Sequence, residues 1–262
     1  MLGTGWLGLP LSQFLVDNGF NVKGSTRSAE RFGELLKSGI NPFHLDLENS
    51  HFGEDTFFNS DILIINIPYK GIVEFATFIH KIEQSKISKV IFISSTSVYG
   101  NKDDEILEQD LDCLIPCPLL TIENLFTSNK HFTTTVLRFA GLIGYNRNPA
   151  LFFKNNRQVK DPDSPVNMIH RDDCLNIISL IIEKNAWGEI YNCCADTHPT
   201  KRAFYTYAAI QSQLPKPYFS KLNNNGSKII SNRKVKSDLA YDFIHHDLLN
   251  LPFNNLTNSI NT

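Results

Sequence analysis

Two short, nearly continuous apolar runs, DILIINI at residues 61–67 and KVIFIS at residues 89–94, constrain the fold of this chain more than any other feature. Such β-branched runs are typical of strands that are buried on both faces of a parallel sheet. The segment between them, residues 71–84, places its apolar side chains at helical spacing. Strands that alternate with helices of this length form βαβ units, so the sequence predicts an α/β fold with a doubly wound parallel sheet.

A glycine pattern near the start of the chain, GTGWLG at residues 3–8, fits a dinucleotide-binding turn of the Rossmann type. Gly3 would permit the tight turn, Gly5 would let the backbone approach a pyrophosphate, and Gly8 would let the following helix pack closely. Free N–H groups at the helix start would face the phosphates. We therefore expect the whole stretch to bind the cofactor: Gly3, Thr4, Gly5, Trp6, Leu7 and Gly8. The alternative is a glycine-rich turn without a ligand.

Only Met1 and Leu2 precede this turn, whereas the pattern ordinarily follows a buried strand. We expect residues upstream of Met1 to complete that strand.

The alternation of strands and helices loosens after about Tyr145. We expect a dinucleotide-binding core over residues 1–145, and residues 146–262 are expected to complete the sheet and form a small substrate-binding lobe. Further strands are predicted at residues 20–25, 42–47, 135–140 and 189–193, and further helices at residues 6–18, 29–38, 121–126, 172–182 and 200–214.

Composition excludes several classes of protein. A formal net charge of −2 provides no basic field for nucleic acid. The apolar runs are too short to span a bilayer, and no signal-peptide pattern opens the chain, so we expect a cytoplasmic protein and no membrane partner.

The cysteine count of 5 argues against a disulfide framework. We expect buried thiols and no metal site, with a zinc site as the less favoured alternative.

Four further stretches follow the glycine pattern in order: FISSTSVYG at 92–100, VLRFAGLIG at 136–144, NMIHRDDCLNII at 167–178 and KIISNRKVKSDLAYDF at 228–243. With them the chain resembles the extended short-chain dehydrogenase/reductases, the family of NAD-dependent nucleotide-sugar epimerases and dehydratases. Its ending is similar to that of the atypical members. The resemblance implies a bound dinucleotide and a small-molecule substrate, which could be a nucleotide sugar.

The resemblance also implies that Ser95 is catalytic and donates a hydrogen bond to the substrate oxygen. Active members add a tyrosine and a lysine spaced Y-x-x-x-K, in which the lysine lowers the pKa of the phenol so that it can act as a base. This chain has no tyrosine between Tyr99 and Tyr145, and the expected window, residues 113–130, holds only the lysine Lys130. The usual Tyr–Lys pair is therefore missing.

Four residues are candidates to replace the missing base: Tyr69, Tyr99, Tyr145 and His170. We favour a packed residue for Tyr99 and a structural histidine for His170. A further candidate, Glu123, is interpreted as a charge on the solvent face of its helix.

The choice of dinucleotide depends on the end of the second predicted strand. NAD-binding folds carry an acidic residue about 20 positions past the glycine pattern. Here no Asp or Glu lies between Asp17 and Glu30, and Thr26 and Arg27 occupy the expected place. An arginine fork suits the 2′-phosphate of NADP, which we therefore prefer over NAD.

The resemblance adds cofactor contacts elsewhere in the core. It implies that Asp46 and Leu47 lie near the adenine, that Ile67 and Pro68 line the adenosine ribose, and that Ser94 belongs to the same site.

Two functional hypotheses follow. The first is an NADP-dependent epimerase, dehydratase or reductase, and the second is a non-catalytic dinucleotide-binding redox sensor or scaffold. The sequence leaves the substrate and the oligomeric state open.

Overall fold

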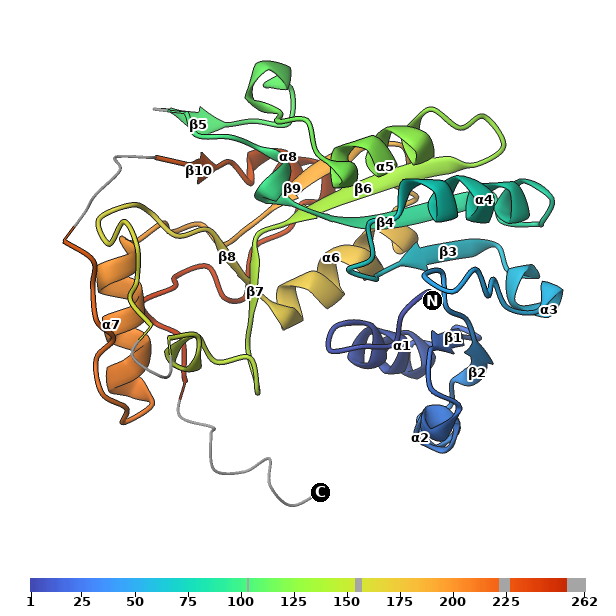
Figure 1. Ribbon diagram of the computed structural model, residues 1–262, viewed down its shortest axis with the longest axis horizontal. Helices are drawn as coiled ribbons and strands as arrows, with labels where there is room; N and C mark the ends of the chain where they lie inside the picture. The colour runs from blue at the N-terminus through green and yellow to red at the C-terminus, as the bar shows by residue number, and fades with distance from the viewer. Residues whose placement is uncertain (103, 154–156, 222–226, 254–262) are drawn as a thin grey trace. The chain divides into compact units, whose positions relative to one another are not determined.

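The structure, a computed structural model, describes residues 1–102, 104–153, 157–221 and 227–253 (Figure 1). The chain divides into two compact units that alternate along the sequence. Unit 1 comprises Met1–Val98, Ile115–Arg138 and Ile178–Tyr191, and unit 2 comprises Tyr99–Leu114, Phe139–Ile177 and Asn192–Thr262. The boundary expected at residue 145 stays a prediction.

A parallel sheet runs through unit 1. Its strands are β1 (Lys23–Thr26), β2 (Asn41–His44), β3 (Ile62–Ile65), β4 (Lys89–Ser95), β6 (Thr133–Phe139) and β9 (Ile190–Cys193). The last residues of β6 and β9 belong to unit 2. Strands β3, β4, β6 and β9 are hydrogen-bonded in that order, and β1 pairs with β2. The β1–β2 and β3–β4 pairs are both parallel. The α/β class with a parallel sheet is therefore confirmed.

The first residues of the chain connect β1 with β3. On one side the Leu2 N–H donates to the Ile64 carbonyl (2.8 Å), and the Leu2 carbonyl accepts from Asn66 N (2.9 Å). On the other side the Met1 carbonyl accepts from Ser25 N (2.9 Å). Residues 1–2 thus take the place of a strand between β1 and β3. Whether further residues precede them stays a prediction.

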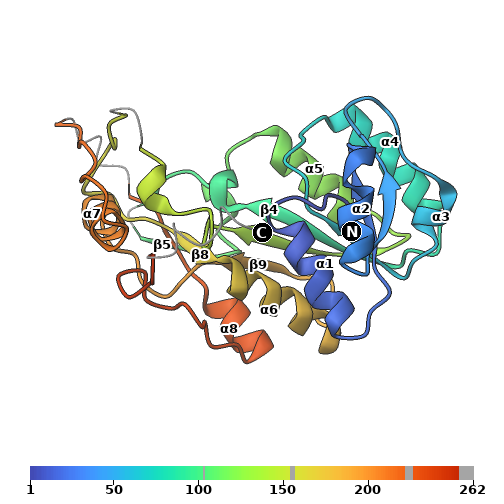
Figure 2. The same ribbon diagram turned by 90° about the horizontal axis from the view of Figure 1, so that it is seen from below.

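Helices cover both faces of this sheet. In unit 1 they are α1 (Gly8–Asp17), α2 (Phe32–Lys37), α3 (Asp55–Phe58), α4 (Ile72–Glu83) and α5 (Pro118–Thr127). Figure 2 shows α4 and α5 on one face and α1 on the other. Aromatic rings fill the layer beneath α4 and α5, where the Phe126 ring lies 5.2 Å from Phe92 and 5.9 Å from Phe75.

A buried ion pair joins α5 to β6. The Arg138 guanidinium donates to the Glu123 carboxylate (Nη2 to Oε2, 2.7 Å), and both side chains are only 2% exposed. The Ser94 hydroxyl at the end of β4 donates to the other oxygen of Glu123. The prediction of a solvent-facing Glu123 is therefore wrong. Glu123 lies on the same buried side of α5 as Leu119 and Phe126, where Arg138 compensates its charge.

Unit 2 is built from short strands, helices and loops. Its strand pairs, both parallel, are β7 (Gly141–Ile143) with β8 (Met168–His170), and β5 (Glu105–Ile106) with β10 (Ile229–Ile230). Its helices are α7 (Lys201–Gln211) and α8 (Arg233–Leu239), while α6 (Arg171–Glu183) begins in unit 2 and ends in unit 1. Thr200 caps α7, because its hydroxyl accepts from Ala203 N (3.2 Å). Short 3-10 turns occur in both units: η1 (Ala29–Arg31) and η2 (Thr96–Val98) in unit 1, and η3 (Leu111–Cys113) and η4 (Pro149–Leu151) in unit 2.

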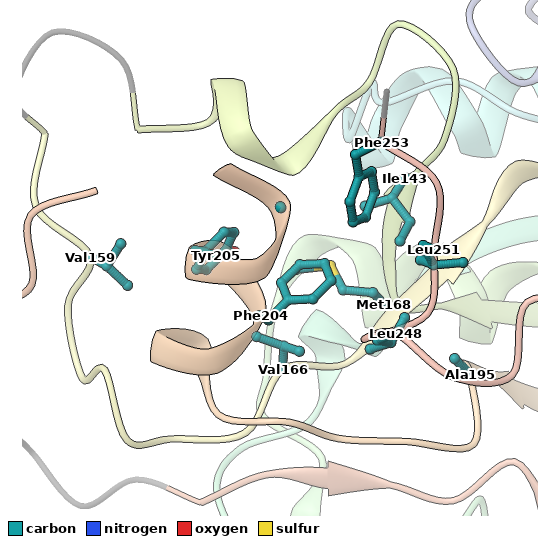
Figure 3. Close-up of a cluster of buried hydrophobic side chains, with 11 residues drawn as sticks. Ile143, Val159, Val166, Met168, Ala195, Phe204, Tyr205, Leu248, Leu251 and Phe253 are labelled. Atoms are coloured by element: carbon teal, nitrogen blue, oxygen red, sulfur yellow. The ribbon is translucent and has the colours of Figure 1, made fainter. Parts of the chain in front are cut away.

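An apolar cluster forms the core of unit 2. Phe204 of α7 points toward Met168 of β8 and toward Leu248 of the C-terminal segment, and Leu251 and Phe253 complete this side (Figure 3). All five side chains are at most 9% exposed. The C-terminal segment is thus part of the core as far as Phe253.

Two expectations about the chain as a whole can be compared with this structure. Within the described residues, no helix is both long and apolar enough to cross a membrane. The thiols of Cys113, Cys174, Cys193 and Cys194 are buried and that of Cys117 is half-buried, which confirms the expectation of mostly buried thiols.

The buried ion pair gives a prediction about stability. Arg138→Met should lower the free energy of unfolding by roughly 3–5 kcal/mol, because it leaves the Glu123 carboxylate buried without its cation. The control is Lys81→Met, which breaks an exposed pair with Asp55 (42% and 93% exposed). Urea unfolding would measure both variants. Equal unfolding midpoints would contradict the role assigned to the pair.

Candidate functional site

A cavity of about 530 Å³ opens in unit 1 beside the carboxyl ends of β1, β2 and β3. Ligands of doubly wound folds bind outside this edge of the sheet. The lining comprises Leu2, Gly3, Thr4, Gly5, Ser25, Thr26, Arg27, Ser28, Arg31, Leu45, Asp46, Leu47, Glu48, Asn66, Ile67, Pro68 and Tyr69.

Most of the predicted cofactor residues meet at this cavity. Those in the lining are Gly3, Thr4, Gly5, Thr26, Arg27, Asp46, Leu47, Ile67 and Pro68. Among the described residues of the lining, four predicted cofactor positions are missing: Trp6, Leu7, Gly8 and Ser94. The predicted catalytic residue Ser95 is also outside this lining. Leu7 is buried at the start of α1, and the Ser94 hydroxyl is bonded to Glu123.

The three glycines of the loop differ in their surroundings. Gly3 has φ +92°, and a Cβ there would lie 2.5 Å from the Asn66 carbonyl oxygen. A Cβ on Gly8 would lie 1.9 Å from the Gly3 carbonyl oxygen. At Gly5, by contrast, a Cβ would meet no atom of the described residues within 4 Å. Gly3 and Gly8 are therefore required for packing, whereas Gly5 leaves open space toward the cavity.

Hydrogen bonds fix the loop to its neighbours. The Gly3 N–H donates to the Ser25 hydroxyl (2.9 Å), and the Thr4 hydroxyl donates to the Ser25 carbonyl (2.9 Å). The Arg31 guanidinium donates to the Thr4 carbonyl (3.0 Å) and to the Glu34 carboxylate (2.9 Å). The loop is thus held from β1 on one side and from Arg31 on the other.

The cavity carries charges of both signs. Arg27 forms an ion pair with Glu48 (3.3 Å), and the two side chains are 70% and 60% exposed. The hydrogen bond from the Asn49 amide, followed by the Glu48 N–H and the charge of Arg27, lowers the pKa of Asp46. One arginine and two carboxylates therefore share this part of the lining.

Several lining residues were not predicted as cofactor residues, among them Arg31, Glu48 and Asn66. The sequence contained a signal for two of them. Asn66 is the polar residue inside the apolar run at 61–67, and Arg31 is a second arginine shortly after Arg27. Neither position belongs to the glycine pattern or to the strand end on which the prediction rested.

Neither Tyr69 nor Tyr145 has the lowered pKa of an activated phenol. Partial burial and a hydrogen bond to the Glu74 carboxylate raise the pKa of Tyr69, and partial burial and Asp172 raise that of Tyr145. A tyrosinate base needs a shift in the opposite direction. Tyr99 is 1% exposed and donates to Asn192 (3.0 Å), which confirms a packed residue.

Ser95 ends β4, and its hydroxyl accepts from the Ser97 N–H (3.1 Å). The hydroxyl proton is not used in that bond and can still be donated. The catalytic role of Ser95 stays a prediction.

Comparisons with known proteins agree with this fold. No protein-family model matches the chain. Protein YeeZ of Escherichia coli strain K12 is 29% identical over 96% of this chain and 97% of its own length.

Solved structures resemble the chain over nearly its whole length. UDP-glucose 4-epimerase of Thermotoga maritima, solved with UDP-glucose, has a TM-score of 0.75 at 14% identity and covers 96% of both chains. UDP-glucuronic acid 4-epimerase of Bacillus cereus, in complex with UDP-glucuronic acid and NAD, has a TM-score of 0.72 at 19% identity. The match covers 95% of this chain and 94% of that one. The chain therefore has the Rossmann-like fold of the NAD-dependent nucleotide-sugar epimerases.

Proposed function

We propose that this chain binds a nicotinamide adenine dinucleotide in the cavity of unit 1, with the pyrophosphate over Gly5. The observation that carries the proposal is the contrast within the glycine loop. Gly3 and Gly8 are closely packed, while the space beside Gly5 is open. That space is where the backbone of such a loop approaches a pyrophosphate, and N–H groups at the start of α1 favour an anion there.

The remaining contacts are assigned by position. Trp6 and Leu7, before the start of α1, would lie beside the phosphates. The Thr4 N–H donates to the Ser25 carbonyl (3.1 Å), so Thr4 would border the ligand without that N–H. Ile67 with Pro68 would line the adenosine ribose. Asp46 and Leu47 would border the adenine. Ser94 is assigned to the same site, and its hydroxyl is bonded to Glu123.

NADP is the preferred form of the dinucleotide in this proposal. The Arg27–Glu48 pair is exposed, and exposed ion pairs contribute about 0–1 kcal/mol, so the guanidinium can exchange Glu48 for a 2′-phosphate. NAD is the alternative, since the Asp46 and Glu48 carboxylates in the same lining would repel that phosphate.

In its catalytic form, the proposal is that the chain belongs to the epimerase/dehydratase family and acts on a nucleotide sugar or another small polyol. The bound dinucleotide supplies hydride transfer, and Ser95 would donate a hydrogen bond to the substrate oxygen. A non-catalytic redox sensor or scaffold is the second candidate. It is favoured by the missing Tyr–Lys pair and by the raised pKa values of Tyr69 and Tyr145. A cytoplasmic location stays a prediction.

The first test is Gly5→Val. The branched side chain would occupy the space proposed for the pyrophosphate, so NADPH binding should disappear at concentrations that saturate the parent protein. The thermal midpoint should change little, because the new Cβ meets no atom of the described residues within 4 Å. Gly33→Val is the matched control, since Gly33 is exposed on α2 with similarly open surroundings. Unchanged NADPH affinity in Gly5→Val would overturn the proposed site.

A second test addresses the choice between NADPH and NADH. Arg27→Ala should weaken NADPH binding by about ten- to a hundred-fold, which corresponds to one charged hydrogen-bonding partner, and should leave NADH almost unaffected. Glu48→Gln should strengthen NADPH binding, because it removes both a competing partner of Arg27 and a repelling charge. Calorimetric titration measures the NADPH and NADH affinities of the parent protein and of both variants. Tighter NADH than NADPH binding by the parent protein would reject the preference for NADP.

The third test concerns catalysis. A general base contributes about 10²–10⁴-fold, so turnover of UDP-sugars should fall short of ordinary epimerases by roughly that factor. Product chromatography with purified protein, NADP and a panel of sugar nucleotides measures it. Fast turnover would reject the non-catalytic candidate. If turnover is detected and Ser95→Ala leaves it unchanged, Ser95 is only a structural residue.

A further inference from the structure

Three metal-binding side chains converge in unit 2, a part of the structure that the proposed function does not use. His170 ends β8, Asp172 lies in the first turn of α6, and His245 follows α8. One carboxylate oxygen, Asp172 Oδ2, lies 3.3 Å from His170 Nδ1 and 3.1 Å from His245 Nε2. The ligand atoms of all three residues lie within 4.8 Å of one another.

These separations fit the ligands of one small cation. Zinc binds histidine nitrogen and carboxylate oxygen at about 2.0–2.2 Å with tetrahedral geometry, which places neighbouring ligand atoms about 3.3–3.5 Å apart. The two measured distances to Asp172 Oδ2 are close to that value. The ligand atoms of all three residues lie within 4.8 Å of one another, and binding would draw them together around a shared ion.

The position of the His170 ring selects its ligand atom. Gly144 has φ +115°, and a Cβ there would lie only 2.4 Å from His170 Nε2, so this edge of the ring lies against backbone. The opposite nitrogen, Nδ1, accepts a long hydrogen bond from the Asp172 N–H (3.3 Å). In that bond Nδ1 carries no proton and its lone pair faces the Asp172 N–H, so a bound metal ion would take the place of this long hydrogen bond.

A second layer of hydrogen bonds orients the other two ligands. The Tyr145 hydroxyl donates to Asp172 Oδ1 (2.8 Å), which leaves Oδ2 directed toward the histidines. The backbone of His245 is fixed by Asp173, whose Oδ2 accepts from the His245 N–H (3.2 Å) and whose Oδ1 accepts from the Ile244 N–H (2.7 Å). Such outer partners are typical of metal sites, where they hold the ligands in place before the ion binds.

The cluster is also sheltered enough to retain an ion. The side chains of His170, His245 and Asp172 are 13%, 19% and 31% exposed. The partial exposure of Asp172 leaves an entry path from solvent and room for a fourth ligand.

We propose that His170 Nδ1, Asp172 Oδ2 and His245 Nε2 bind one Zn²⁺ ion, with a fourth coordination position open to solvent. Two imidazoles and one carboxylate favour a first-row transition metal over Mg²⁺, which prefers oxygen ligands. The site would connect the start of α6 to the C-terminal segment. This proposal differs from the expectation of no metal site. That expectation rested on cysteine spacing and did not consider histidines far apart in the sequence. The alternative without a metal is direct contact of His170 and His245 with Asp172 Oδ2.

The test is zinc titration of the full chain after treatment with a chelator. Calorimetry should show 1:1 binding of Zn²⁺, no competition by excess Mg²⁺, and a rise in the thermal midpoint, because the ion binds only the folded state. His245→Ala should abolish binding. His246→Ala should leave it unchanged, because His246 is exposed and its backbone carbonyl, which the substitution keeps, accepts from Asp196 N (3.0 Å) and Thr197 N (3.2 Å).

A milder variant keeps the test decisive if His245→Ala does not fold. Tyr145→Phe removes only the hydroxyl that orients Asp172, and it should weaken zinc binding by about 10- to 100-fold. Titration of the parent protein with Co²⁺ should add visible absorption bands of a histidine-bound ion, and Zn²⁺ should displace them. The proposal would be overturned if the parent protein showed no 1:1 zinc binding. It would also be overturned if folded His245→Ala and His246→Ala bound zinc equally well.

Discussion

The contact between Gly8 and the Gly3 carbonyl oxygen determines where the first helix of unit 1 begins. A Cβ on Gly8 would lie 1.9 Å from that oxygen, so any other residue would push α1 away from the turn. The turn itself requires a positive φ at Gly3, and its backbone is held beside Ser25. Because both contacts are tight, the free space of the loop is concentrated beside Gly5. The proposed dinucleotide site depends on this one arrangement of backbone.

Two ion pairs of unit 1 illustrate how burial separates structural from functional charges. Glu123 and Arg138 are each 2% exposed, and their pair also binds the Ser94 hydroxyl at the end of β4. Such a pair cannot exchange partners without leaving a charge in the core. Arg27 and Glu48 are mostly exposed, so their pair is weak and its arginine can turn to a phosphate. The buried pair holds the end of β4 against α5 through the Ser94 hydroxyl. The exposed pair supplies the arginine that is proposed to recognise the 2′-phosphate.

The sequence predicted those features that depend on local pattern. Apolar runs gave β3 and β4, and the glycine spacing led to the loop that borders the cavity. Features that depend on contacts between distant segments were not predictable in this way. The burial of Glu123 requires Arg138 on a neighbouring strand, and the grouping of His170 with His245 requires a fold that brings together residues 75 positions apart in number. A single polar residue on a helix does not reveal such a partner.

Hydrogen exchange measured with and without NADPH tests the central claim most directly, because it locates the ligand without altering the protein. The account predicts slower exchange of backbone amides in four segments that border the cavity, residues 2–5, 25–28, 45–48 and 66–69. Exchange over residues 72–83 of α4, outside the cavity lining, should change little. Unchanged exchange in all four segments at saturating NADPH, or protection confined to other parts of the chain, would contradict the assignment of this cavity as the dinucleotide site.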